Sequence, residues 1–225
     1  MFMFRRKLVS QAIRVFVPAL VGLLGGYMFG GLIQAQESLL TNGAFQTGDV
    51  SGWSTFTTPN GTLGIGLPEV VQFDVNGDGT PTLSAKFQVG QLSYNPDVYA
   101  GGGIYQEVYL LAGDYTVSAT AEIASSFEGP GLANSSGGIF ELLLDGGVVA
   151  SYDFGTITAG TTERSTLAAS LSLATEGSHE LRIRITRPFQ PSPYQYLGNV
   201  ALTADAPSGG ADPTATPVPP DEETP

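Results

Sequence analysis

Apolar and polar residues alternate with a period of two through much of the chain. In residues 115–122 and 181–186 every apolar side chain is followed by a polar one, the pattern of half-buried β-strands. Apolar-rich segments bounded by Gly, Asp, Asn and Ser predict further strands at residues 70–75, 83–89, 104–110, 139–144, 148–154, 167–173 and 197–203. Beyond residue 35, no stretch of a dozen residues has the period of an amphipathic helix. Nine such segments predict an all-β sandwich or barrel and exclude a parallel α/β fold, because its crossover helices are missing.

The first 35 residues have the organisation of an export signal. Basic residues (Arg5, Arg6, Lys7 and Arg14) precede an uncharged run at residues 15–33, and Ala35 offers a cleavage site. The run of 19 residues is longer than the usual ~7–15 of a signal peptide and approaches the ~20 that span a bilayer. Residues 1–35 are therefore interpreted as a hydrophobic leader helix, either a signal peptide or an uncleaved anchor, which would be the only membrane contact. Both alternatives predict an extracellular or cell-surface protein.

Charge and cysteine content restrict the partners and the source of stability. Without the leader, five Lys and Arg residues stand against 21 acids, a net charge of −16. Nucleic acid is not expected as a partner, because binding phosphates needs clustered basic residues. Cysteine is absent, so an exported domain depends on its hydrophobic core. We expect one domain at residues 36–205, followed by a disordered, acidic, Pro-rich tail at residues 206–225.

The segment LLTNGAFQTGDVSGW at residues 39–53 marks the start of this domain. It predicts a short strand at Leu39 and Leu40, two turns, core positions for Phe45 and Trp53, and a next strand that opens at Gly52 and Trp53. This opening resembles that of carbohydrate-binding modules of the four/nine type, and the segments at residues 104–124, 140–155 and 179–203 resemble their later strands. The resemblance implies a single antiparallel jelly-roll β-sandwich, galactose-binding-like, with a polysaccharide or glycan as its partner. It leaves the oligomeric state open.

Aromatic and polar side chains suited to sugars gather in three places. Aromatic faces stack on the C–H surfaces of sugar rings, and carboxylates or amides bind hydroxyl groups. Tyr105, Glu107 and Tyr109 share one face of a predicted strand. Tyr94 and Tyr99 lie in the Gly-containing loop before it, and Tyr194 lies near the last strand. The alternative is that these rings fill the core or cover loops, as tyrosines of a sandwich often do.

Two places suggest a calcium ion. Asp74, Asn76, Asp78 and Thr80 match the first half of a calcium-binding loop, but its twelfth position is Ala85 instead of glutamate. The alternative is a tight hairpin in which glycines take positive φ. The resemblance implies a second site, at Gln46 and at Gly198 or Asn199. Since these residues carry no charge, we expect that site to be weak or absent.

Three function classes follow. The first is an exported, non-catalytic carbohydrate-binding protein, and the second is a structural or adhesive surface protein that binds proteins or itself. The third is a glycoside-active enzyme, for which paired carboxylates could serve. Catalysis is not expected, because His179 is the only histidine and no nucleophile motif is present.

Overall fold

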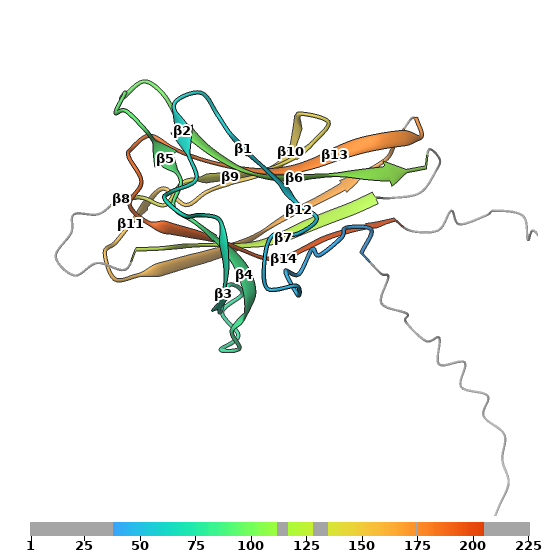
Figure 1. Ribbon diagram of the computed structural model, residues 1–225, viewed down its shortest axis with the longest axis horizontal. Helices are drawn as coiled ribbons and strands as arrows, with labels where there is room; N and C mark the ends of the chain where they lie inside the picture. Colours follow the sequence, from blue (N-terminus) through green and yellow to red (C-terminus); the bar gives the residue numbers. More distant parts are fainter. Residues whose placement is uncertain (1–37, 112–116, 128–134, 174, 205–225) are drawn as a thin grey trace, which may run out of the picture. The chain divides into compact units, whose positions relative to one another are not determined.

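Two five-stranded antiparallel sheets form the body of the domain (Figure 1). The computed structural model describes residues 38–111, 117–127, 135–173 and 175–204. The first sheet has the strand order β1-β6-β13-β9-β10 and the second the order β12-β7-β14-β4-β3. Two short pairs, β2-β5 and β8-β11, complete the fold. The strands are β1 (Ser54–Thr57), β2 (Gly61–Thr62), β3 (Glu69–Phe73), β4 (Thr82–Phe87), β5 (Gly90–Gln91), β6 (Ala100–Leu110), β7 (Val117–Ser126), β8 (Ser135–Ser136), β9 (Ile139–Leu144), β10 (Gly147–Asp153), β11 (Thr156–Ile157), β12 (Thr162–Leu171), β13 (Gly177–Arg187) and β14 (Tyr194–Ala204).

The prediction of an all-β antiparallel jelly-roll sandwich is confirmed. Each of the nine predicted segments overlaps one strand of the two large sheets. The described ranges contain no helix, and so none that could cross a bilayer. The predicted leader and tail lie outside the described residues.

The core lies between the two sheets and is built by the alternation seen in the sequence. In β6 and β13 the inward positions are fully or almost fully buried, whereas intervening residues such as Tyr105, Tyr109 and Arg182 reach the surface. Large apolar side chains from both sheets meet there, including Ile104, Phe140, Leu181 and Leu197. Burying one such side chain contributes about 1.5–3 kcal/mol, so this contact holds the sheets together.

The segment before β1 is a series of turns, and the strand predicted at Leu39 and Leu40 does not form. The backbone of Asn42 has a φ of 54°. The side-chain amide of Asn42 donates hydrogen bonds to the Asp49 and Ser51 carbonyl oxygens at 3.0 and 2.9 Å. The predicted core position of Trp53 is confirmed, because only 8% of it is exposed. At the predicted strand itself, the Leu40 amide donates to the Ser38 hydroxyl oxygen at 3.3 Å, a local bond that takes up a backbone group a strand would have paired.

Two further contacts fix this segment to the sandwich. The Leu39 amide donates to the Leu202 carbonyl oxygen at 2.7 Å, so the first described residues lie beside the end of β14. Gln106 in β6 donates to the Thr41 and Gly52 carbonyl oxygens at 2.9 and 2.8 Å. The buried side-chain amide of Gln106 therefore ties the opening turns to β6, an inner strand of the first sheet.

Candidate functional site

The outer face of the first sheet carries three of the predicted ligand-binding residues. Tyr105, Glu107 and Tyr109 point outward from β6, while its inward neighbours are buried. Tyr109 is 66% exposed. The predicted alternation along this strand is confirmed, and the role of the three residues in binding stays a prediction.

A hollow of about 310 Å³ lies on the same face of this sheet. It is lined by Thr58, Tyr99, Ile139, Glu141, Arg184 and Thr186. Gly101 and Gly103 of β6 are paired with Thr186 and Arg184 of β13, so β6 adds no side chain beside them. The space exists because two consecutive outward positions of β6 are glycines.

The glycines also allow β6 to lie close to its neighbour. A Cβ atom at Gly101 would collide with the Ile185 carbonyl oxygen, and one at Gly103 with the Ile183 carbonyl oxygen. Both contacts are with backbone, which has no other rotamer to adopt. The AGGG sequence at residues 100–103 therefore serves strand packing and the shape of the hollow together.

Two arginines on β13 are held by carboxylates along this face. The Arg184 Nε atom lies 2.6 Å from Glu141 Oε2 on β9, and this hydrogen bond raises the pKa of Arg184 above its ordinary value. Arg182 pairs with Glu180 at 2.8 Å, and its guanidinium carbon lies 4.2 Å from the centre of the Phe56 ring. Paired in this way, the arginines keep a fixed geometry and present N–H groups next to carboxylate oxygens.

The arrangement suits a hydroxyl-rich ligand. Phe56 and Tyr105 lie edge to face with centroids 6.3 Å apart, and Tyr99 lines the hollow. Donors from Arg184, acceptors from Glu141 and hydroxyl groups of Thr58 and Thr186 share one concave space with the Tyr99 ring. Such mixed surfaces bind flat molecules with a polar rim.

The other three predicted tyrosines lie outside strand β6. Tyr94 and Tyr99 are both exposed in the loop between β5 and β6. Tyr194 lies on β14 in the second sheet, with Lys86 Nζ 4.2 Å from its ring centre. The structure thus brings Tyr99 to the same face as Tyr105 and Tyr109, but not Tyr194.

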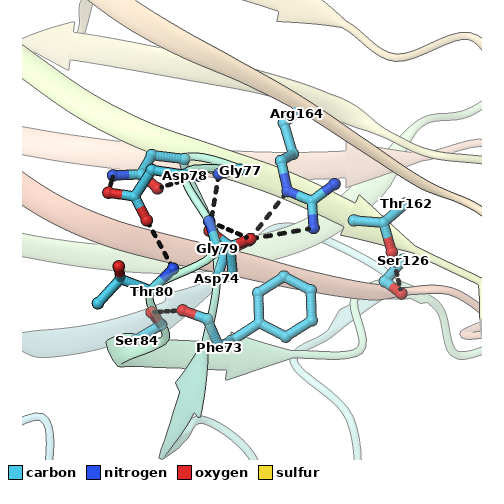
Figure 2. A network of polar contacts seen from close by, with 11 residues as sticks. Phe73, Asp74, Gly77, Asp78, Gly79, Thr80, Ser84, Ser126, Thr162 and Arg164 are labelled. Atoms are coloured by element: carbon cyan, nitrogen blue, oxygen red, sulfur yellow. Dashed lines mark hydrogen bonds and ion pairs between the residues drawn. The ribbon is translucent and has the colours of Figure 1, made fainter.

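The predicted calcium loop is the connection between β3 and β4 (Figure 2). Asp74 accepts hydrogen bonds from the Gly77 and Gly79 amides at 2.8 and 3.2 Å, and both glycines have positive φ as the hairpin alternative predicts. The Thr80 amide donates to Asp78 at 2.7 Å and is the main cause of the lowered pKa of Asp78. The side-chain amide of Asn76 donates a hydrogen bond to the Asp78 carboxylate at 3.2 Å.

Arg164 ties this loop to the opposite edge of the second sheet. Its Nε donates to the Asp74 carbonyl oxygen at 2.9 Å, and its Nη2 lies 4.0 Å from the Asp74 carboxylate (Figure 2). Beneath the loop, Val75 is buried and the Phe73 ring stacks on Tyr196 at 3.7 Å. The chain itself therefore covers this part of the outer face of the second sheet.

The second predicted calcium place borders a hollow of about 270 Å³. Its lining includes Gln46 and Asn199, together with Glu122 of β7 and Asn76 of the β3–β4 loop. The sequence did not single out Glu122 for this site, because only the pairing of β7 with β14 brings it beside Gly198. In the described ranges no three His, Asp or Glu side chains converge as metal ligands. Whether calcium binds stays a prediction.

We expect chelation to change the melting temperature little. Affinity for Ca²⁺ follows ligand charge, and this hollow offers one carboxylate. At a dissociation constant equal to the calcium concentration, binding adds only about 0.4 kcal/mol. Thermal melts in calcium and in EDTA check this, with Glu122→Gln as the control. A shift of many degrees that Glu122→Gln removes would show a tight site.

His179 has a structural position. Its buried ring contacts Asp145 at 2.6 Å and the Thr175 carbonyl oxygen at 3.3 Å, so both nitrogens have partners. Burial raises the pKa of Asp145, but hydrogen bonds from His179 and the Glu180 amide outweigh it and lower that pKa overall. The ring fixes the β9–β10 turn against the start of β13.

Solved structures similar to this chain include a cyclase and a xylan-binding domain. No protein-family model matches the chain, and no curated protein matches it. A Stig cyclase of Fischerella sp. TAU, solved with an indole compound, is 19% identical over 75% of this chain and 96% of its own, with a TM-score of 0.46. The CBM22-1 xylan-binding domain of Paenibacillus barcinonensis Xyn10C is 12% identical over 76% and 96%, with a TM-score of 0.40.

A larger protein gives a third match. The CBM22-1–GH10 modules of Clostridium thermocellum xylanase 10B, solved with xylohexaose, are 18% identical over 72% of this chain and 27% of theirs, with a TM-score of 0.37. Since these identities reach only 19% and these TM-scores only 0.46, the similarities carry no function to this chain.

Proposed function

We propose that this protein is an exported, non-catalytic carbohydrate-binding β-sandwich of the four/nine type. The observation that carries the proposal is the hollow on the outer face of the first sheet, where Tyr99 and the Arg184–Glu141 pair border one open space. The half-buried ring of Tyr105 and the exposed ring of Tyr109 on the same face support it. The leader at residues 1–35 supports export, and sequencing the N-terminus of the secreted protein would test cleavage after Ala35.

Alanine substitutions on this face should weaken glycan binding. Tyr99→Ala and Tyr105→Ala each remove a stacking surface, and we expect each to lower affinity about fivefold to tenfold. Affinity gels and isothermal titration against a glycan panel would measure this. Ile65→Ala is the matched control, because Ile65 is a fully exposed apolar residue in the loop between β2 and β3.

The result also separates the function classes. Glycan binding that is unchanged in Tyr99→Ala, Tyr105→Ala and Tyr109→Ala would remove these residues from the site. A stable oligomer by light scattering, with no glycan bound, would favour the adhesive class. Turnover of a bound oligosaccharide would contradict the non-catalytic assignment.

A further inference from the structure

Burial is inverted at the end of the sandwich where β5 meets the β13–β14 loop. Large apolar side chains point to solvent there, whereas Gln91, Arg187 and Gln195 are fully buried. The exposed side chains are Leu92, Tyr94, Val98, Tyr99 and Phe189. Buried polar groups require partners, and clustered exposed apolar groups commonly mark binding surfaces. Buried polar side chains and exposed apolar side chains, each unfavourable for stability, therefore occur together at this end of the sandwich.

Arg187 holds together the β4–β5 connection and the β13–β14 loop at this end of the sandwich. Its Nη1 donates to the Gln190 carbonyl oxygen at 3.0 Å and to that of Val89 at 3.3 Å. Its other nitrogens bond Ser136 and Ser135 at 2.7 and 2.8 Å. Among the described residues it has no acidic partner, and burial lowers its pKa to about 10. The buried guanidinium of Arg187 thus fixes the backbone at Val89, Ser136 and Gln190.

The loop at residues 92–99 is fixed at its base in the same way. Gln91 donates to the carbonyl oxygens of Asn95 and Val98 and accepts from the Asn95 amide at 2.6 Å. Asn60 accepts from the Ser93 amide at 3.0 Å and donates to its carbonyl oxygen at 2.7 Å. The loop that carries the exposed rings is therefore preorganised, which lowers the entropy cost of binding.

Two of the exposed rings stack beside each other. The rings of Tyr94 and Phe189 are parallel within 5°, with centroids 6.2 Å apart. Both residues are exposed, so together they offer more aromatic surface to solvent than one ring. We call this pair the ring platform. Its 58% and 44% exposure shows that the core does not need these faces.

We propose that a carbohydrate chain bound in the hollow continues over Tyr99 onto the ring platform, so that the ligand is an oligosaccharide or polysaccharide. Tyr99 connects the two surfaces, since it lines the hollow and ends the loop that carries Tyr94. Five residues extend at most about 18 Å, a span that one oligosaccharide covers. The proposal rests on the carbohydrate function proposed above and adds the length of the ligand.

The proposed extension of the ligand onto the ring platform is tested by measuring affinity as a function of ligand length. Wild type, Tyr94→Ala/Phe189→Ala and the control Ile65→Ala would be titrated with xylose-, glucose- and mannose-based series from disaccharide to hexasaccharide. We expect the platform variant to bind the hexasaccharide about tenfold more weakly than wild type and the disaccharide equally well. Its melting temperature should stay within about 2 °C, because both rings are exposed.

The outcomes separate the two proposals. If wild type binds none of the series, the carbohydrate function fails and this inference fails with it. If wild type binds and the platform variant matches it at every length, only this inference is overturned. If concentrated wild type dimerises and the platform variant does not, the rings are a self-association surface, which also overturns it.

Discussion

Alanine at Gly103 is expected to lower the free energy of unfolding by about 3 kcal/mol or more. The new Cβ atom would collide with the Ile183 carbonyl oxygen, a backbone atom of the neighbouring strand. Relief requires β6 and β13 to move apart at the centre of the first sheet, which breaks ladder hydrogen bonds there. For a domain of this size, such a loss corresponds to a fall of about 6–12 °C in melting temperature.

The matched control for this substitution is Gly147→Ala on edge strand β10. There the nearest atom to an added Cβ is the Leu144 carbonyl oxygen at 3.4 Å, an ordinary contact. That change should be neutral or slightly stabilising, because alanine restricts the unfolded chain. Thermal melts followed by circular dichroism would compare the two. Equal stability of Gly103→Ala and Gly147→Ala would contradict the close approach of β6 and β13.

Arg187→Met is expected to lower the free energy of unfolding by a similar amount, about 3 kcal/mol or more. Replacing a buried ion pair by apolar residues can be neutral, because both charges leave. Here the partners are the carbonyl oxygens of Val89, Ser136 and Gln190, which no substitution of Arg187 removes. Methionine would leave them without a donor, and each unsatisfied buried group costs about 1–3 kcal/mol.

Arg164→Met provides the comparison for the loss of an arginine. Its side chain is about one-third exposed, and its ion pair with Asp74 is long at 4.0 Å. Exposed ion pairs contribute about 0.2–1 kcal/mol, so this variant should melt close to wild type. Chemical denaturation would measure both. An Arg187→Met protein as stable as Arg164→Met would show that the Arg187 hydrogen bonds contribute little.

The large strands could be predicted because each carries its own pattern. The alternation in β6 also gave the correct outward face for Tyr105, Glu107 and Tyr109. Strand β1 follows the opening predicted at Gly52 and Trp53, whereas β2, β5, β8 and β11 could not be found this way, because two residues are too few to show a period. Pairing with longer strands or with each other defines them.

The hollow was not predicted, since its walls come from distant parts of the chain. Glu141 and Arg184 are 43 residues apart and meet only because β9 pairs with β13. One local signal was present: three consecutive glycines in a strand indicate a close backbone approach. The β3–β4 loop was correctly interpreted as a hairpin in one alternative, but its contact with Arg164 depends on a strand at the far edge of the sheet.

The pairing of Leu39 with Leu202 has a consequence for how the domain presents itself. β14 runs from Tyr194, next to the loop that carries Phe189, to Ala204, near the first described residues. Its 11 residues extend about 36 Å. Chain on either side of the domain is thus joined to it at one pole, and the ring platform lies near the other. Tethered by either end, the domain would hold its aromatic surface away from the attachment point and open to a large, immobile ligand.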